Sequence, residues 1–473
     1  MINLVSTAHE KGLKVILDVV PNHTADYFNG SSSTYDSNTY QPAAPFNNPD
    51  WYHHFGDITD WSDENQVLNY DLGGLDDLNQ DNPDARQAIK DAYKAWVEDT
   101  GADGVRIDAA RSLPKDFIQE FENYLGVPSF GEIFVGDVDY VSDFSNYEWG
   151  VLDFPLFFQA REVFAHDASF TTVKSIFDQD SKYNDVNHLV TFIDNHDRDR
   201  FLCLADDNYQ KLRLALTFIF TVRGIPDVYY GTEQNCYGGG VPTEWAGIAN
   251  KENREVMPGF DEDGITFKYI QRLTELRKEY ACLQTGTQRE MWAEDNIYAF
   301  SRRDDSNGQE IISVFNNGTS NETRAIPLRA ESSLAVGTTL TNLLDTSVTA
   351  TVEAGGITGK VLNLTIPAKT AWVFTSDNVA DYAPPARTVT TIRVHYDVGL
   401  GNTMYLRGSD YPLTWDSGRS MLNVSSDVWV YETERIGKGE SFELKPLIND
   451  TTWSSGNNYT VVGGETIDIY PNF

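Results

Sequence analysis

The chain has 473 residues, more than one ordinary hydrophobic core accommodates, so two or three domains are expected. Its hydrophobic fraction of 40% and aromatic fraction of 12% are typical of a folded globular protein and exclude wholesale disorder. The 36 Lys and Arg residues against 71 Asp and Glu residues give a formal net charge of −35. Because such a field repels phosphate backbones and anionic lipid, neither nucleic acid nor a membrane is an expected partner.

The first residues and the cysteines carry little information. MINLVSTAHEKGLK lacks the basic start and apolar middle of a signal peptide, and no apolar run approaches the length of a membrane span. Three cysteines, Cys203, Cys236 and Cys282, cannot all pair within one chain, and their spacing matches no zinc pattern. A disulfide between Cys203 and Cys236 is one arrangement left open.

From residue 1 to about 276, short β-branched apolar runs alternate with longer amphipathic stretches. This pattern is typical of βα units around a parallel sheet. Helices are predicted at 84–99 and 209–222, among others. The predicted strands number about six and lie at residues 15–20, 104–107, 129–133, 151–154, 189–193 and 228–230.

Beyond residue 280 the pattern changes to alternating strands with turn residues, as in IYAFSRRDDSNGQEIISVFNNGT. We therefore expect an antiparallel β domain over residues 277–377, after a domain of βα units over residues 1–276. The Pro-rich and Ala-rich stretch 378–387 is predicted to be a linker. A last β unit, residues 388–473, follows it.

Polar residues gather at the ends of four predicted strands. The segments are DVVPNH at 18–23, GVRIDAAR at 104–111, FGEIF at 130–134 and FIDNHD at 192–197. The C-terminal ends of the strands build the active site in a (β/α)₈ barrel. One Asp or His at such a position is usually a cap or a loop hydrogen-bond partner, but four segments on four strands favour a catalytic site.

Glycosidic cleavage needs two carboxylates, one on each side of the bond. They lie about 5 Å apart if one of them attacks the sugar, and farther apart if a water molecule must fit between them. Asp108 and Glu132, on adjacent strand ends, can lie at the shorter distance. Arg106 precedes Asp108 by two residues, so both side chains are expected on one face, where the cation would hold Asp108 ionised as a nucleophile requires. The apolar Phe130 and Phe134 are expected to raise the pKa of Glu132 toward that of a general acid.

These four segments resemble the conserved regions of the α-amylase superfamily, glycoside hydrolase family 13. LGGLDDLNQDNPDARQ at 72–87 is similar to the extra region that those enzymes carry before the nucleophile. The resemblance covers about residues 1–375. It implies a TIM (β/α)₈ barrel of the α/β class followed by an antiparallel β domain, and retaining chemistry on α-glucans.

The resemblance also implies roles for individual residues. Asp108 falls on the nucleophile, Glu132 on the acid/base, and Asp197 on the carboxylate that stabilises the transition state. The positions of substrate-binding residues are occupied by His23, Arg106, Arg111, His196 and Arg254. The positions of structural calcium ligands are occupied by the oxygen donors Asn22, Asp77 and Ser112, the last through its backbone carbonyl.

Three departures from the family pattern bear on function. Arg111 and Ser112 stand where many amylases have Lys-His, which leaves product preference open, and Asn250 replaces an Asp that usually helps to bind sugar. Family members also carry about two βα units before the DVVPNH strand. Because six strands cannot close an eight-stranded barrel of normal shear, we expect this chain to be an N-terminally truncated copy of a longer extracellular enzyme, its signal peptide lost with the N-terminus.

The last unit contains Trp415, Trp429 and Trp453 among strand-like runs. Exposed aromatic rings stack on sugar faces, although a Trp in a small β domain is more often part of the core. The stretch LRGSDYPLTWDSG at 406–418 is similar in layout to starch-binding modules. We therefore expect a C-terminal β-sandwich that binds carbohydrate.

Together these features predict an endo-acting α-1,4-glucan hydrolase that degrades starch, glycogen or maltooligosaccharides and contains structural calcium. Its partner is an α-glucan polysaccharide or oligosaccharide. One alternative is a transglycosylase of the cyclodextrin glucanotransferase type, because HHFGDITDWSDENQVLNYDLGGLDDLNQ resembles that branch. Another is a non-catalytic starch-binding remnant, which the incomplete barrel suggests.

Overall fold

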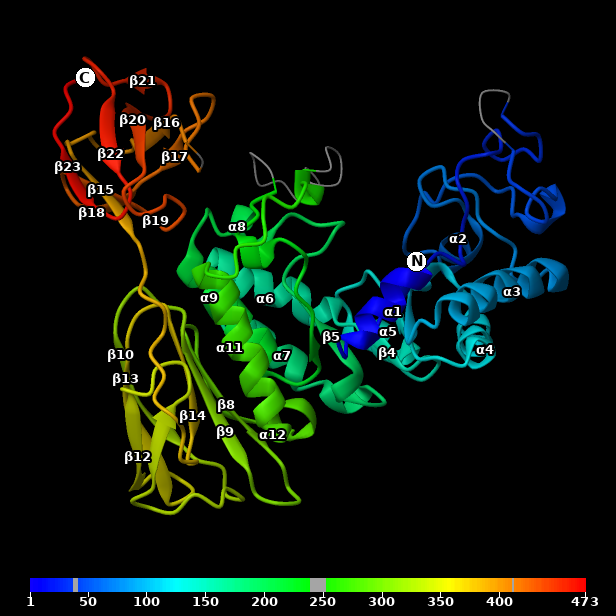
Figure 1. Ribbon diagram of the computed structural model, residues 1–473, viewed down its shortest axis with the longest axis horizontal. Helices are drawn as coiled ribbons and strands as arrows, with labels where there is room; N and C mark the ends of the chain where they lie inside the picture. Colours follow the sequence, from blue (N-terminus) through cyan, green and yellow to red (C-terminus); the bar gives the residue numbers. More distant parts are fainter. Residues whose placement is uncertain (37–40, 239–251, 411) are drawn as a thin grey trace. The chain divides into compact units, whose positions relative to one another are not determined.

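The computed structural model describes residues 1–36, 41–238, 252–410 and 412–473 (Figure 1). The chain divides into two compact units, each described by itself. Unit 1 comprises Met1–Gln159, Val173–Thr191 and Arg223–Asp227. Unit 2 comprises Ala160–Thr172, Phe192–Val222 and Val228–Phe473.

Unit 1 is built on a sheet of six parallel strands that follow one another in chain order. The register sets Asp18 beside Arg106, and Ile107 beside Gly131. Because all six strands are parallel, their C-terminal ends meet at one edge of the sheet. The strands are β1 (Ile16–Val19), β2 (Gly104–Ile107), β3 (Ser129–Gly131), β4 (Gly150–Leu152), β5 (Leu189–Thr191) and β6 (Ile225–Pro226).

Helices connect the strands, and capping residues fix where several of them begin and end. In α3 the Asn82 side chain accepts from two backbone N–H groups, and Gly101 ends the helix at φ 73°, a left-handed conformation that favours glycine. The helices are α1 (Ile2–Glu10), α2 (Glu64–Asn69), α3 (Pro83–Thr100), α4 (Lys115–Leu125), α5 (Val138–Phe144), α6 (Phe154–His166), α7 (Thr171–Phe177), α8 (Phe201–Leu204), α9 (Tyr209–Thr221), α11 (Ile265–Glu279) and α12 (Ala281–Thr285).

One sequence expectation was wrong, and one arrangement left open is now decided. The sixth strand is Ile225–Pro226, not 228–230, because Ile225 and Pro226 pair with β5, whereas the rings of Tyr229 and Tyr230 lie against the Arg200 guanidinium. The disulfide left open between Cys203 and Cys236 does not form, since neither cysteine is disulfide-bonded and both are buried.

The middle of unit 2 is an eight-stranded sheet in the order β10-β13-β12-β11-β14-β9-β8-β7. Apolar side chains that alternate along these strands form one core, in which Ile297, Val314 and Leu362 are fully buried. The strands are β7 (Thr287–Ala293), β8 (Ile297–Arg303), β9 (Glu310–Asn316), β10 (Glu322–Pro327), β11 (Thr339–Asn342), β12 (Thr349–Ala354), β13 (Lys360–Ile366) and β14 (Thr370–Thr375).

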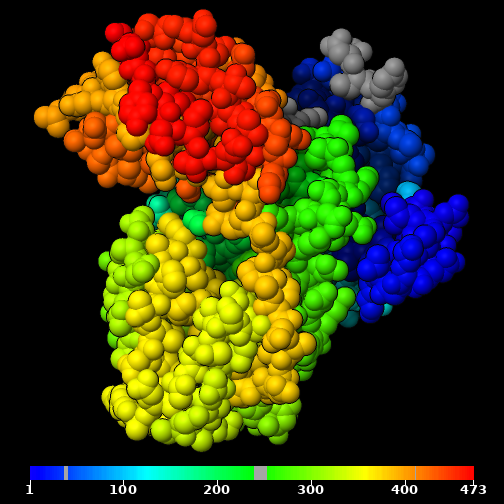
Figure 2. Space-filling model, turned by 60° about the vertical axis from the view of Figure 1, so that its left-hand side comes forward, coloured from blue at the N-terminus to red at the C-terminus, as the bar shows by residue number. Residues whose placement is uncertain are grey.

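The C-terminal module, residues 388–473, consists of two sheets that share a second core; Figure 2 shows it in orange and red. One sheet has the order β18-β19-β15-β23, and the other contains β17, β16, β20 and β21 with β22 paired to β20. The strands are β15 (Thr390–His395), β16 (Met404–Gly408), β17 (Arg419–Ser420), β18 (Leu422–Ser425), β19 (Val428–Thr433), β20 (Ser441–Ile448), β21 (Thr452–Trp453), β22 (Tyr459–Val462) and β23 (Thr466–Ile469).

This architecture confirms the expected fold class: a parallel α/β sheet of barrel type, an antiparallel β domain and a C-terminal β-rich module. Among the described residues, none of the helices has both the length and the apolar character needed to cross a bilayer.

A buried carboxyl group lies against Gly131 of β3 in unit 1. Glu148 is only 6% exposed, and neither of its carboxyl oxygens has a hydrogen-bond partner among the described residues. A methyl group at Gly131, in β3, would overlap both oxygens, so the carboxyl fills the space that this glycine leaves. Burial, reinforced by the charge of Glu122, raises the pKa of Glu148 well above its ordinary value of 4.5.

Replacing Glu148 by Gln is expected to stabilise the protein increasingly as pH rises above about 4.5. In that range the unfolded chain releases the Glu148 proton while the folded protein keeps it, so folding stability falls with pH by about 1.4 kcal/mol per unit until the folded pKa is reached. Glu148→Gln removes this term and keeps the shape. Urea unfolding of both proteins from pH 4 to pH 9 measures it.

Glu98→Gln is the matched control, because the Glu98 side chain is 65% exposed. It should leave the pH profile unchanged within error. Parallel stability curves for wild type and Glu148→Gln would show that Glu148 ionises in the folded protein as it does in the unfolded chain.

Candidate active site

The first three strands of unit 1 bring four charged side chains to one edge of the sheet. Asp18 lies in β1 and Arg106 is its partner in β2, while Asp108 and Glu132 directly follow β2 and β3. Backbone hydrogen bonds continue the pairing past the strand ends: Asp108 N donates to Val19 O at 2.8 Å. The carboxylates that the sequence places on separate strands therefore lie around one arginine.

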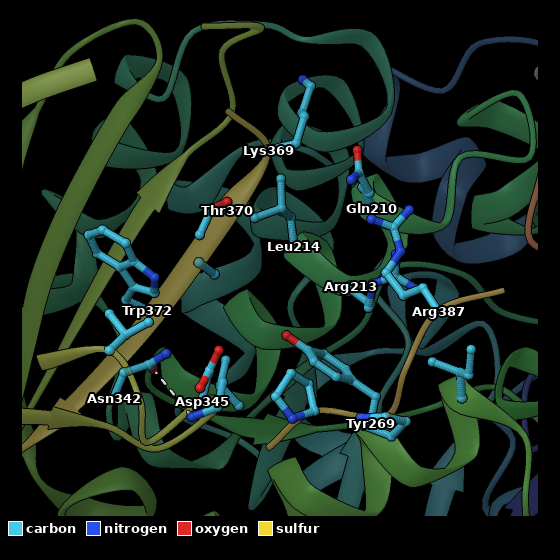
Figure 3. A pocket seen from close by; sticks show the side chains of 16 residues that line it. Gln210, Arg213, Leu214, Tyr269, Asn342, Asp345, Lys369, Thr370, Trp372 and Arg387 are labelled. Atoms are coloured by element: carbon cyan, nitrogen blue, oxygen red, sulfur yellow. Dashed lines mark hydrogen bonds between the residues drawn. The ribbon is translucent and has the colours of Figure 1, made fainter. Parts of the chain in front are cut away.

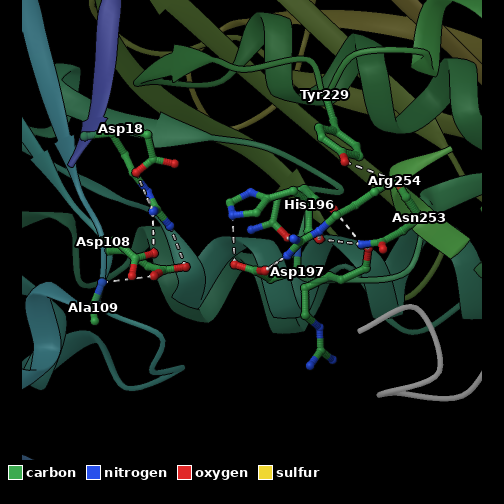
Figure 4. Close-up of polar contacts among 12 residues, drawn as sticks. Asp18, Asp108, Ala109, His196, Asp197, Tyr229, Asn253 and Arg254 are labelled. Carbon is green, nitrogen blue, oxygen red and sulfur yellow. Dashed lines mark hydrogen bonds and ion pairs between the residues drawn. The ribbon is translucent and has the colours of Figure 1, made fainter. Parts of the chain in front are cut away.

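The Arg106 guanidinium binds all three carboxylates (Figure 4). Its Nη1 lies 2.5 Å from Asp108 Oδ1 and 2.8 Å from Asp18 Oδ1, and its Nη2 lies 2.9 Å from Glu132 Oε1. Arg106, Asp108 and Glu132 have side chains exposed by 14%, 22% and 11%, so water screens these contacts only partly. Burial alone would lower the pKa of Arg106, but the charges of Glu132, Asp108 and Asp18 outweigh it and raise the pKa.

The backbone just after Asp108 is held in an uncommon conformation. Ala109 has φ 49° and ψ 33°, a left-handed conformation that costs a non-glycine residue roughly 1 kcal/mol or more. Its N–H donates to Glu132 Oε2 at 3.3 Å (Figure 4). Glu132 is thus fixed at both oxygens, one by Arg106 and the other by the Ala109 backbone.

His23 lies in the same part of unit 1. Burial lowers its pKa below 6.5, and the charge of Asp108 opposes this only in part. Its Nδ1 is 3.0 Å from Asn22 Oδ1. The imidazole is therefore neutral at neutral pH and suited to hydrogen bonding with an uncharged ligand.

Three predicted calcium ligands form one buried cluster. Asn22 Nδ2 donates to Asp77 Oδ1 at 2.9 Å and to the Ser112 carbonyl at 3.0 Å. His53 Nδ1 contacts the other oxygen of Asp77 at 2.6 Å. Burial raises the pKa of Asp77 to about 7 although His53 opposes it. Among the described residues, no group of three or more His, Cys, Asp or Glu side chains is arranged to hold a metal.

Arg111 has a place of its own in this unit. Its guanidinium lies over the rings of Trp61, at 5.0 Å, and Tyr140, at 5.6 Å. Its Nη2 donates to the Trp61 carbonyl at 2.9 Å, and its backbone N–H donates to the Glu132 carbonyl at 3.2 Å. Arg111 therefore connects the backbone at Glu132 to an aromatic pair.

The remaining predicted residues belong to unit 2, where Asp197 is held by two side chains, those of Arg254 and His196 (Figure 4). Arg254 Nη2 lies 2.6 Å from Asp197 Oδ1, and His196 Nε2 lies 3.1 Å from Oδ2. Arg254 Nε also donates to the His196 carbonyl at 2.8 Å. One arginine thus fixes both the side chain of Asp197 and the backbone before it.

Asn253 also holds the backbone of the segment that contains Asp197. Its Nδ2 donates to the carbonyls of His196 and Arg198 at 2.8 Å each, and its own carbonyl accepts from the Tyr229 hydroxyl at 3.1 Å. The side chain is fully buried. Asn250, where the family usually has an Asp, lies outside the described residues.

Two features of the site escaped the sequence prediction. Asp18 was not singled out, although its position beside Arg106 in the strand register is the signal that would have identified it. The contact between Glu132 and Arg106 was also missed, because the sequence reasoning assigned Arg106 to Asp108 alone; the raised pKa expected for Glu132 stays a prediction. The ring of Phe130 packs on Trp149, and that of Phe134 packs on Phe154.

Known proteins with similar sequences are α-amylases and related enzymes. A family model described as the alpha amylase catalytic domain matches residues 1–286. The β/α-amylase of Paenibacillus polymyxa is 38% identical over 383 residues, which are 79% of this chain and 30% of that protein. A cyclomaltodextrin glucanotransferase of Bacillus sp. strain 38-2 is 29% identical over 98% of this chain and 68% of that protein. The chain thus spans less than a third of the first relative.

Solved structures of both kinds are similar as well. An Anoxybacillus α-amylase has a TM-score of 0.66 and 29% identity, and the alignment covers 80% of this chain and 79% of that one. An α-amylase of Geobacillus thermoleovorans, complexed with acarbose, has a TM-score of 0.66 and 28% identity over 79% of each chain. A cyclomaltodextrin glucanotransferase with three domains has a TM-score of 0.68 and 31% identity over 80% of this chain and 78% of that one.

Proposed function

The chain belongs to the α-amylase family, and on this premise we propose that it cleaves α-1,4-glucans with retention, using Asp108 as nucleophile and Glu132 as acid/base. The observation that carries the proposal is the Arg106 guanidinium, whose two terminal nitrogens bind the two carboxylates. Carboxylates bound by one guanidinium are close neighbours. This fits the separation of roughly 5 Å in retaining enzymes better than the roughly 6.5–9.5 Å of inverting ones.

The reaction proceeds in two displacements. Asp108 attacks the anomeric carbon while Glu132 gives its proton to the leaving glycosidic oxygen, so a glycosyl ester forms as the bond to the leaving sugar breaks. Glu132 then takes a proton from a water molecule, which attacks the same carbon and releases Asp108. Both steps pass through a cationic sugar that nearby negative charge stabilises.

Asp197 is the third carboxylate of the proposal. Arg254 and His196 hold both of its oxygens, so the carboxylate keeps one orientation in which it can accept hydrogen bonds from sugar hydroxyls. His23 and His196 are proposed to bind the sugar at the cleavage point, with Arg111 in the neighbouring subsite. A neutral His23 suits an uncharged sugar.

Water and a sugar hydroxyl are both candidate acceptors in the second displacement. We propose that water is the main acceptor and that attack is endo, which makes the chain an α-amylase. A cyclodextrin glucanotransferase is the second candidate, favoured because relatives of that kind align over 98% of this chain. The two differ in products and not in the catalytic carboxylates.

Two substitutions are expected to separate the catalytic roles. Asp108→Asn should abolish turnover of every α-glucan substrate, because no covalent intermediate can form. Glu132→Gln should lower kcat/KM on maltooligosaccharides by roughly 10²–10⁴-fold, but kcat/KM on a maltooligosaccharide fluoride far less, because the fluoride leaving group needs no proton. On the fluoride kcat should still fall, because Glu132 is also the base of the second displacement. Steady-state kinetics on both substrates measure this, with Tm confirming that the variants fold.

The products of the wild-type protein test the same proposal. Proton NMR of the first products should show the α-anomer, and chromatography of a soluble-starch digest should show linear maltooligosaccharides. Cyclic glucans as main products would contradict the proposed hydrolase and identify the enzyme as a transglycosylase. Equal, background-level rates for wild type and Asp108→Asn would contradict an enzymatic function and favour a starch-binding remnant.

We also propose that calcium binds at Asn22, Asp77 and Ser112. The donor set fits a hard cation: a carboxylate, a backbone carbonyl and, after rotation of the Asn22 amide, an amide oxygen, all within one buried cluster. Calcium bound there would link the loop after β1 to the segments that contain Asp77 and Ser112. Its proposed contribution is to stability and not to a chemical step.

Removal of calcium by a chelator is therefore expected to lower Tm, and added calcium to restore it, by the equivalent of about 2.7 kcal/mol at 100 times Kd. In Asp77→Asn the carboxylate is lost while the hydrogen bond to Asn22 can persist, so Tm should no longer respond to calcium. Differential scanning calorimetry with and without calcium measures both. An equal calcium shift in wild type and Asp77→Asn would place the ion elsewhere.

The C-terminal module is proposed to bind α-glucan through two of its three tryptophans. Trp415 and Trp453 are 38% and 42% exposed, and their ring centroids are 6.3 Å apart at an interplanar angle of 33°. Arg407 supports the pair: its guanidinium lies over the Trp453 ring, and its Nη1 donates to the Trp415 carbonyl. Trp429, in contrast, is 7% exposed and donates to the Tyr396 carbonyl, so it belongs to the core.

Loss of either exposed ring should weaken binding to starch granules by about fivefold, because each ring contributes stacking of roughly 1 kcal/mol. The variants are Trp415→Ala and Trp453→Ala, and a granule pull-down measures the partition. Tyr470→Ala is the control, since Tyr470 is an exposed ring of the same module that stacks on His395. Unchanged partition in both tryptophan variants would contradict the assignment.

A further inference from the structure

Two segments of unit 2 hold Asp197 in place. The first, residues 192–208, contains His196, Asp197 and α8. The second, residues 228–238, contains Tyr229, whose hydroxyl binds the carbonyl of Asn253. Because Asn253 in turn binds the backbone around Asp197, a shift of either segment changes where this carboxylate lies.

Two arginines of the C-terminal module each contact both segments. Arg435 binds the Asp207 carboxylate, with Nη2 at 3.1 Å from Oδ1, and also donates to the Asn235 carbonyl. Arg419 lies 3.1 Å from Asp206 Oδ1, and its guanidinium covers the Tyr237 ring at 4.7 Å from the centroid. Each side chain therefore joins the first segment to the second.

The two arginines bind a turn, at Asp206 and Asp207, that has an unusual backbone and a buried carboxylate. Asp206 and Asp207 have φ 53° and 59°, a left-handed conformation that non-glycine residues rarely adopt, and the Asp207 side chain is 1% exposed. Burial raises the pKa of Asp207 to about 6, and the charge of Arg435 is the largest effect that opposes it. The positive charge that faces this buried carboxylate therefore comes from Arg435 of the module, outside the turn.

The module is fixed at the residue next to Arg435 as well. Glu434 is 6% exposed and is bound by Arg213 of α9, through two contacts of 2.9 and 2.7 Å, and by Arg387 of the linker at 2.7 Å. Figure 3 shows Arg213 and Arg387 side by side at one end of a cavity of about 270 Å³. Arg435 thus directly follows a residue, Glu434, that is bound to α9.

A simple tether between domains does not account for this arrangement. The contacts of Glu434 with Arg213 and Arg387 would by themselves attach the module to α9. Arg419 and Arg435 reach instead to two loop segments that hold Asp197 in place, and each joins the one segment to the other.

We propose that the C-terminal module positions the Asp197 carboxylate, with Arg419 and Arg435 as positioning residues that lock the two supporting segments together. This role rests on the proposed function of Asp197. It is separate from starch binding, because it uses Arg419 and Arg435 and not the Trp415 and Trp453 rings.

The test compares Arg419→Met/Arg435→Met with wild type in the full chain. Hydrogen exchange of residues 195–208 and 228–238 should rise in the variant, and kcat on a short chromogenic maltooligosaccharide should fall by about 10- to 100-fold with a smaller change in KM. Arg435→Lys should give an intermediate kcat, because one ammonium can neutralise Asp207 but lacks the fork that also reaches Asn235. The control is Arg393→Met, at an exposed arginine of β15.

Exchange that is unchanged in both segments, or raised only within residues 388–473, would overturn the proposal. So would a loss of activity that appears equally in Arg393→Met. The exchange measurement does not depend on turnover. If wild type has no activity on any α-glucan, the proposed function fails, while exchange in the two segments still decides whether the arginines lock them.

Discussion

The arrangement of unit 1 depends on one cation among three carboxylates. In a chain with a net charge of −35, negative groups have few positive partners, and Asp108 beside Glu132 would repel each other without one. Arg106 binds both and Asp18 as well. It can do so because β1, β2 and β3 are adjacent and in register, so the sheet is what converts a distant sequence pattern into a local cluster. Chemistry at this site therefore begins with strand pairing.

The same physical solution recurs in unit 2 at larger scale. Asp197 is held by Arg254, and the buried Asp207 is held by Arg435 from the module. Guanidinium groups suit this task because their planar fork binds a carboxylate and a carbonyl together, which an ammonium does less well. The carboxylates of the candidate site and of the Asp207 turn are thus each in contact with an arginine, in a chain that is otherwise strongly acidic.

The sequence predicted what depends on local pattern. Strand β2 and the polar residues at the strand ends follow from apolar runs and their boundaries. Features that depend on tertiary contacts were missed. Strand β6 is Ile225–Pro226 because these two residues pair with β5. The Glu132 carboxylate contacts Arg106 of the neighbouring strand, although the residues near Glu132 in the sequence include two phenylalanines. The three tryptophans look alike in sequence, and only packing distinguishes the buried Trp429 from the exposed Trp415 and Trp453.

Sharing one guanidinium also bears on how a single glutamate can serve as acid and then as base. On the proposed mechanism, Arg106 first faces the negative charges of Asp108 and Asp18 together with Glu132, and the charge of Asp108 opposes ionisation of Glu132. Once Asp108 has become an ester, that charge is gone. The attraction of Arg106 then acts mainly on Glu132 and Asp18 and stabilises the carboxylate form of Glu132, which the second displacement requires. On the proposed mechanism, the arginine that contacts all three carboxylates would thereby couple the charge states of Asp108 and Glu132.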